Sequence, residues 1–116
     1  MSKFPKTAEP TLRFNGFNNP WRISELGEYL TFKNGINAGK EAYGSGYKFI
    51  NVLDIINNDF ITYDAITGLV DVDKKTFQKN EVSYGDILFQ RSSESREEAG
   101  QSNVYLDGER KACFGG

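Results

Sequence analysis

The apolar residues of this chain come in short runs separated by glycine, asparagine and aspartate, and this spacing limits the chain to short structural elements. The run Ile87-Leu88-Phe89, for example, lies between Gly85-Asp86 and a polar stretch over residues 91–101. Short apolar runs bounded by turn residues are typical of strands in a small sheet. Twelve glycines and three prolines in 116 residues supply many further positions for tight turns. The sequence therefore predicts short strands joined by turns.

The order of these segments predicts an α+β domain preceded by an arm. Residues 1–20 hold all three prolines and are expected to be extended. One short helix is expected over 22–31, with Ser24 as its N-cap, although Gly27 disfavours it. A helical turn is expected over 74–79, and strands over 47–52, 60–63, 69–72, 86–90, 104–106 and 112–114. We therefore expect an N-terminal arm (1–20) and a small mixed domain (21–116) of short, mainly antiparallel strands with one or two short helices.

Several functional classes are disfavoured by residues that the sequence lacks. The chain has no histidine, which removes the commonest general base and most zinc sites. Its one cysteine, Cys113, has no partner for an internal disulfide and is expected to be a small buried hydrophobe, as in a reducing cytoplasm. Neither a membrane-spanning segment nor a secretory signal is evident. We expect a cytoplasmic protein with no metal or other cofactor.

The charge distribution divides the chain into a basic part and an acidic part. Residues 1–48 hold seven Lys or Arg against four acids, whereas residues 49–116 hold seven against twelve. The formal net charge is −2, so the sequence as a whole does not resemble a general polyanion binder. A basic part could still face nucleic acid, and an acidic part could instead face a basic protein partner.

Three catalytic interpretations were weighed. The stretch Gly35–Lys40 is one residue too short between its glycines for a phosphate-binding loop, and Glu41 follows the lysine. The tripeptide Asn19-Pro20-Trp21 is similar to an amino-methyltransferase motif but lacks its second proline, which leaves turn chemistry. A magnesium-dependent nuclease would need clustered carboxylates near a lysine. The candidate groups are Asp54 with Asp73 and Lys75, or Asp86 with Glu109 and Lys111, and solvated turn charges are the alternative reading.

Three ordered segments carry a resemblance to a known family. The first comprises Pro10, Leu12-Arg13-Phe14, Gly16-Phe17, Trp21 and Leu26-Gly27-Glu28, and the second is the stretch from Phe49 to Ile55. The third and most specific is Val82, Gly85-Asp86-Ile87-Leu88-Phe89 and Arg91-Ser92, followed by Gly100. Together they resemble the N-terminal target-recognition domain of the DNA-specificity subunit of type I restriction-modification systems.

The resemblance implies a non-catalytic protein that reads one half of a bipartite target in double-stranded DNA. In that family the specificity subunit binds a methyltransferase subunit and, through the complex, a nuclease-translocase subunit. The chain departs from the family in three respects. It has no helical spacer or second recognition domain, so we expect a truncated domain; Leu53 stands where glycine is common; and the segment 92–100 is acidic. The open alternative is a half-domain that binds a methyltransferase subunit or regulator without binding DNA alone.

The expected DNA-binding residues come from two segments. Lysines and arginines would contact phosphates, and amide and guanidinium groups would read base edges. The glycine-rich segment contributes Lys33, Asn34, Asn37, Lys40, Tyr43 and Lys48, and the segment after the strand at 86–90 contributes Gln90, Arg91, Ser92, Ser93 and Arg96. For each of these residues a mobile polar loop is the competing interpretation. Phe14, Phe17 and Trp21 are expected to anchor the arm to the core, and Asp86 to cap backbone amides in a turn.

Overall fold

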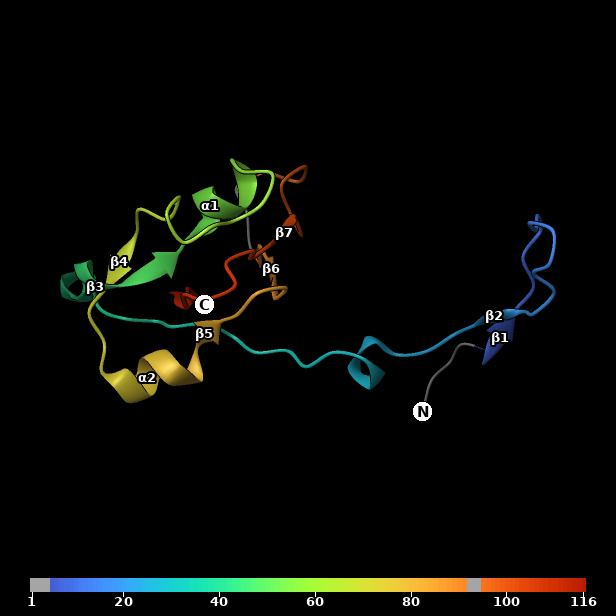
Figure 1. The fold of residues 1–116 in the computed structure, drawn as a ribbon, viewed down its shortest axis with the longest axis horizontal. Helices are drawn as coiled ribbons and strands as arrows, with labels where there is room; N and C mark the ends of the chain where they lie inside the picture. Colours follow the sequence, from blue (N-terminus) through green and yellow to red (C-terminus); the bar gives the residue numbers. More distant parts are fainter. Residues whose placement is uncertain (1–4, 92–94) are drawn as a thin grey trace. The chain divides into compact units, whose positions relative to one another are not determined.

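A computed structural model describes residues 5–91 and 95–116. The chain forms two compact units, residues 1–33 and residues 34–116, here called unit 1 and unit 2 (Figure 1). The boundary between them falls after Lys33, later than the boundary at residue 20 that the sequence predicted. Each unit is described by itself.

Unit 1 is a minimal hairpin followed by a single helical turn. Strand β1 (Thr7–Ala8) pairs antiparallel with β2 (Trp21–Arg22), and the 3₁₀ turn η1 (Leu26–Glu28) follows. The predicted helix over 22–31 is therefore wrong. Gly27 lies inside the turn and disfavours helix. The N-cap residue of the turn is Glu25, whose side chain accepts no capping hydrogen bond, so little stabilises a longer helix.

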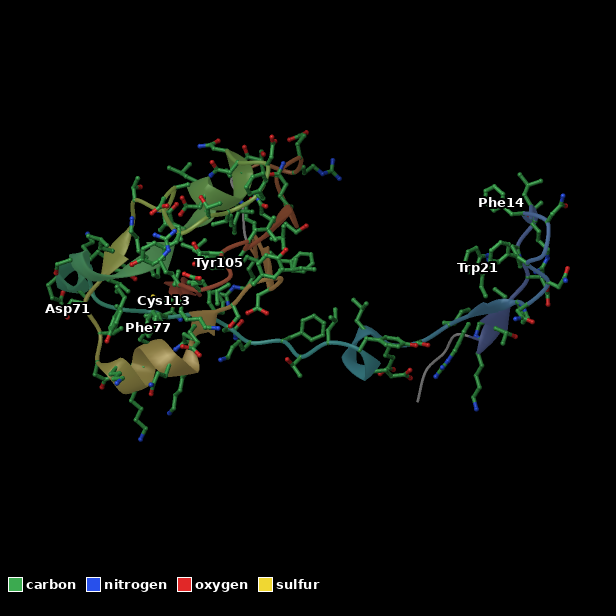
Figure 2. The ribbon with its side chains drawn as sticks, viewed as in Figure 1. Phe14, Trp21, Asp71, Phe77, Tyr105 and Cys113 are labelled. Atoms are coloured by element: carbon green, nitrogen blue, oxygen red, sulfur yellow. The ribbon has the colours of Figure 1, made fainter. Side chains whose placement is uncertain are left out.

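The large apolar side chains of unit 1 are exposed. Phe14, Phe17 and Trp21 have exposed fractions of 84%, 69% and 65%, and Figure 2 labels Phe14 and Trp21. The expected anchoring of the arm to the core by these three side chains stays a prediction, because each unit is described by itself. The two-residue strands and the single turn of unit 1 offer no second layer against which such side chains could pack.

Unit 2 contains a four-stranded mixed sheet in the order β4-β3-β8-β5. Strand β3 (Tyr43–Ile50) pairs antiparallel with β4 (Leu69–Val70) and parallel with β8 (Ala112–Phe114). Strand β8 pairs antiparallel with β5 (Glu81–Val82) on its other side. A separate antiparallel pair is formed by β6 (Ile87–Phe89) and β7 (Ser102–Val104). With its two short helices, the chain is a small mixed α+β protein, as the sequence predicted.

Two short helices and one 3₁₀ turn complete unit 2. The predicted helical turn over 74–79 is confirmed as α2 (Lys74–Lys79), and Asp73 caps it by accepting a 2.7 Å hydrogen bond from the Thr76 N–H. The predicted strand through Val52 is wrong, because β3 ends at Ile50 and helix α1 (Val52–Ile56) begins. Asn51 and Asp54 form a capping box there, and each satisfies the other's backbone amide. The turn η2 (Lys40–Ala42) precedes β3.

Three further strands differ from the sequence prediction. β3 begins at Tyr43 rather than near residue 47, because Gly44 and Gly46 adopt positive φ and allow a register shift against β4. The segment 60–63 contributes only an isolated bridge between Ile61 and Tyr105. β5 was not predicted as a strand.

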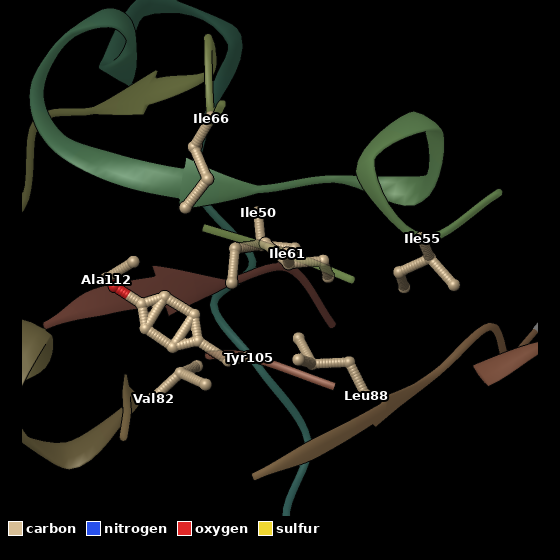
Figure 3. Packing of buried hydrophobic residues seen from close by; sticks show 8 residues of the cluster. All are labelled: Ile50, Ile55, Ile61, Ile66, Val82, Leu88, Tyr105 and Ala112. Carbon is tan, nitrogen blue, oxygen red and sulfur yellow. The ribbon is translucent and has the colours of Figure 1, made fainter. Parts of the chain in front are cut away.

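The core of unit 2 lies between the mixed sheet and the β6–β7 pair. Figure 3 shows its main cluster, in which Tyr105 and Leu88 face Ile50 and Ile61, and the full set is Ile50, Ile55, Ile61, Ile66, Val82, Leu88, Tyr105 and Ala112. Cys113 belongs to the neighbouring cluster with Ile36 and Val70 and is fully buried, which confirms its expected role as a small core residue (Figure 2). In the described ranges, neither α1 nor α2 nor any other helix has the length and apolar character needed to cross a membrane.

Candidate nucleic-acid interface

The β6–β7 hairpin carries the segment that the sequence predicted to bind DNA after β6, and backbone hydrogen bonds join the two ends of that segment. Ile87 lies opposite Val104, Leu88 opposite Asn103 and Phe89 opposite Ser102. One step further, the Gln90 N–H donates a 2.8 Å hydrogen bond to the Gln101 carbonyl. The two ends of the connection between Gln90 and Gln101 are therefore held together. Hairpin connections usually have about two to five residues, so this one is long, and loops held on a rigid base commonly carry binding residues.

The buried side chain of Asn103 attaches this hairpin to α1. Its Nδ2 donates to the Ile55 carbonyl at 3.1 Å and to the Asn58 carbonyl at 2.7 Å. Its Oδ1 accepts from the Val104 N–H at 2.7 Å. Asn103 thus uses donor and acceptor groups together to hold three backbone groups around the end of α1.

The turn before β6 is stabilised by Asp86, as the sequence predicted. The Asp86 Oδ2 atom accepts a 2.9 Å hydrogen bond from the Ser83 N–H, and the Lys111 Nζ donates to the Ser83 Oγ at 2.6 Å. Two other carboxylates of the nuclease hypothesis also accept from backbone amides, Asp54 from Asn51 and Asp73 from Thr76. Among residues 5–91 and 95–116, no group of three or more metal-ligating side chains is positioned to hold an ion.

Arg91 and Arg96 are both exposed in the connection from β6 to β7. Arg91 follows the β6 strand directly after Gln90, and Arg96 lies in the turn that ends at Gly100. Ser92 and Ser93 lie outside the described residues. Gln90 has an exposed fraction of only 5%, so its amide lies in the interior, and we no longer include it among the proposed DNA contacts.

The residues predicted from the glycine-rich segment are divided between several places. Lys33 ends unit 1, whereas the others belong to unit 2. Asn34 and Asn37 are exposed on either side of Ile36, whose backbone bridges Gly115. Lys40 is exposed on η2.

Tyr43 and Lys48 make internal contacts. The Tyr43 hydroxyl accepts a 3.4 Å hydrogen bond from the Ala38 N–H, and its ring packs edge-on against Phe49. The Lys48 Nζ donates to the Ile66 carbonyl and lies 5.4 Å from the centre of the Tyr63 ring. Because its ammonium group makes these internal contacts, we no longer include Lys48 among the proposed DNA contacts.

Arg110 also contacts the Tyr63 ring. Its guanidinium lies 4.5 Å from the Tyr63 ring centre and donates to both carboxylate oxygens of Asp64, at 2.8 and 3.0 Å. It also bonds Asp107 at 2.9 Å. Hydrogen bonds from the Arg110 side chain lower the pKa of Asp64, and the Arg110 backbone N–H is the main cause of the lowered pKa of Asp107.

Part of the glycine-rich segment lies apart from the post-strand segment. Lys40 and Tyr43 lie at the start of β3, whereas Arg91 and Arg96 follow β6, which lies with α1 and β7 beyond the other end of β3 (Figure 1). β3 is eight residues long, which corresponds to roughly 26 Å of extended backbone. Lys40 and Tyr43 therefore do not share one surface with Arg91 and Arg96, and the two arginines form a separate group on the hairpin.

Sequence reasoning missed the apolar outer face of the hairpin. Ile87 and Phe89 alternate with the buried Leu88 and have exposed fractions of 55% and 60%. Phe60, with an exposed fraction of 50%, precedes the bridge between Ile61 and Tyr105, which places it beside Val104 on the same face. The signal was present in the sequence, since apolar residues at 87, 88 and 89 cannot all face one core.

No protein-family model, curated protein or solved structure matches this chain.

Proposed function

We propose that the chain is a non-catalytic DNA-recognition module, related to the target-recognition domains of type I specificity subunits, that contacts DNA through Arg91 and Arg96. The observation that carries the proposal is the fastened β6–β7 hairpin, which presents both arginines to solvent from a base held by the Gln90–Gln101 hydrogen bond. The ordered resemblance to that family runs through the same hairpin. The side chain of Asn103 also joins this hairpin to the end of α1, through its hydrogen bonds to the Ile55 and Asn58 carbonyls.

Arginine suits this task because its planar guanidinium can make paired hydrogen bonds to a guanine edge or to a phosphate. Glu97 and Glu98 lie in the same connection and offset its positive charge. We therefore expect binding that depends on these two side chains and not on a broad basic field. If both contact phosphates, the logarithm of the association constant should fall by roughly two for each tenfold rise in salt.

The test is selection of bound duplexes from a randomised DNA pool at low salt, followed by binding measurements on the enriched sequence. Arg91→Ala and Arg96→Ala are compared with Lys75→Ala, which removes another exposed positive charge, from α2. A changed sequence preference in either arginine variant would identify a base contact. A uniform loss of affinity with a shallower salt dependence would identify a phosphate contact. Equal effects of all three variants, or no enrichment at all, would contradict the proposal.

The second candidate is a protein-interaction half-domain that binds a methyltransferase subunit or a regulator without binding DNA alone. The exposed apolar face formed by Phe60, Ile87 and Phe89 favours this candidate, because isolated domains rarely leave such a face uncovered. Direct titration with a purified methyltransferase subunit of a type I system tests it. Binding that is lost in Phe60→Ser and unchanged in Arg91→Ala would favour this second candidate over the first.

A further inference from the structure

The outer edge of β6 is open. Within the described residues, β6 belongs to a two-stranded sheet and pairs only with β7. In an antiparallel pair, alternate residues direct both backbone polar groups toward the partner strand and the intervening residues direct theirs away. The Asp86 carbonyl accepts from the Tyr105 N–H and the Gln90 N–H donates to the Gln101 carbonyl, so the even-numbered residues face β7. The N–H and C=O groups of Ile87 and Phe89 therefore point to the open edge.

This edge is only three residues long, but it lacks three other features that usually prevent strand addition. Natural edge strands are commonly protected by a charged side chain, a proline or a bulge within the strand. β6 consists of Ile87, Leu88 and Phe89, all apolar, and its pairing with β7 is regular over all three residues. The two side chains that flank Leu88 are more than half exposed. Such an edge is suited to accept another strand.

We propose that the β6 edge pairs with β6 of a second copy of this chain, antiparallel and centred on Leu88. Antiparallel pairing about Leu88 places Ile87 opposite Phe89 of the other copy and Phe89 opposite Ile87. These are the residues whose backbone groups face outward, so every outward N–H meets an outward C=O. The side chains then form two cross-strand pairs of a β-branched residue with an aromatic residue, a favourable combination.

The charges at the ends of the edge favour a second copy in this direction. Asp86 precedes β6 and Arg91 follows Gln90 at its other end. Antiparallel pairing brings the acidic end of one copy beside the basic end of the other, whereas parallel pairing would bring Asp86 beside Asp86. Gly85, which precedes Asp86, has open space where a side chain would stand, so this end of the edge is not crowded. The edge is thus complementary to itself.

The direct test is hydrogen exchange of the backbone amides, followed by NMR at low and high concentrations of the whole chain without DNA. On dimer formation the amides of Ile87 and Phe89 should become protected, in step with the dimer fraction measured by sedimentation. The Leu88 amide, which faces β7 in the single copy, should be protected at both concentrations. A dimer in which the Ile87 and Phe89 amides stay unprotected would overturn the proposal. A chain that remains monomeric at the highest concentration would overturn it too.

A matched pair of variants separates edge pairing from burial of the apolar face. Phe89→Lys places a charge on the edge strand, and Phe60→Lys places the same charge on the same face away from the edge. Both side chains are at least half exposed, so both variants should fold. Phe89→Lys should weaken dimerisation at least about tenfold, because each copy loses an apolar cross-strand pair. Phe60→Lys should leave the dimerisation constant within about twofold.

Equal weakening by both variants, or weakening by Phe60→Lys alone, would indicate packing through the apolar face and overturn the proposal. Since the readout contains no DNA, its result is independent of the proposed DNA recognition.

Discussion

The hydroxyl group of Tyr105 donates a 2.7 Å hydrogen bond to the backbone carbonyl of Arg110, and its ring has no exposed surface. This bond fixes the turn that carries Arg110 to the centre of the core, where Tyr105 packs against Ile61 and Leu88 (Figure 3). Tyr105→Phe keeps the ring and removes the bond, so it should lower the free energy of unfolding by about 1–2 kcal/mol. Urea denaturation measures this loss. Tyr84→Phe, at an exposed position, should change it by less than about 0.5 kcal/mol.

The stability of the chain should fall at alkaline pH. Burial raises the pKa of Tyr105 to about 12 and that of Cys113 to about 11, above their ordinary values of 10.0 and 9.0. The folded state holds both protons more tightly than the unfolded chain does. This contribution is therefore complete below pH 9 and is lost as the pH rises toward 12. Each group should account for on the order of 2 kcal/mol. Urea midpoints at pH 8 and pH 11 test this, and a flat profile would contradict it.

The same burial should make Cys113 unreactive in the folded chain. Its thiol is fully buried, and its Sγ donates a 3.3 Å contact to the Lys48 carbonyl. A thiol reagent at pH 8 should therefore modify Cys113 only as fast as the chain opens, and rapidly once urea unfolds it. A native rate close to that of the unfolded chain would show that the site opens freely.

Asn103 should be intolerant of changes that remove its donors. Asn103→Leu leaves the Ile55 and Asn58 carbonyls without their side-chain donor in a buried place, which should destabilise the chain by about 1–3 kcal/mol. Asn103→Asp should be worse at neutral pH, since a carboxylate would face two carbonyl oxygens, and the deficit should shrink in acid. Thermal unfolding of both variants at pH 7 and pH 4 checks the order. A loss in Asn103→Asp that does not depend on pH would show that the side chain turns outward.

The sequence predicts the strands of this chain better than its helices. Apolar runs at 87–89 and 112–114 coincide with β6 and β8 because each supplies core side chains, Leu88 from the first and Ala112 and Cys113 from the second. Helix α1 was missed because Val52, Leu53, Ile55 and Ile56 look like a strand, and only the capping box formed by Asn51 and Asp54 turns the chain into a helix. The helix expected over 22–31 fails for the opposite reason, since its apolar spacing has no cap and no surface to pack on.

The candidate site was harder to predict because side-chain type does not reveal what a side chain already contacts. Lys48 and Gln90 look like DNA-binding residues in the sequence, yet the first bonds the Ile66 carbonyl and the second is buried. Nor could the sequence place Lys40 and Arg91 relative to each other, since that separation depends on the length and pairing of β3. Arg91 and Arg96 stay in the proposed interface because both side chains are exposed.

Arg110 should make stability depend on pH in the acid range. The pKa values of Asp64 and Asp107 are lowered in the folded chain, Asp64 chiefly by hydrogen bonds from the Arg110 side chain and Asp107 chiefly by the Arg110 backbone N–H. Lowered pKa values contribute stability above the ordinary value of 3.8, and this is lost as the pH falls below it. Arg110→Gln should therefore flatten the dependence between pH 6 and pH 3. Some slope should remain, because hydrogen bonds from Thr76 lower the pKa of Asp73 and those from the backbone still reach Asp107. Urea midpoints across that range measure both slopes.

Gly44 and Gly46 allow β3 to shift register against β4, and two alanine substitutions should separate their roles. Both residues have positive φ, 105° at Gly44 and 96° at Gly46, so alanine should be strained at each by about 1–2 kcal/mol. They differ in space. A side chain at Gly44 would meet nothing within 4 Å, whereas one at Gly46 would collide with the backbone of Val70 and Asp71. Gly46→Ala should therefore destabilise the chain clearly more than Gly44→Ala, because strand β4 must move away as well. Urea unfolding of the two variants measures the difference, and equal losses would mean that β4 retreats at no cost.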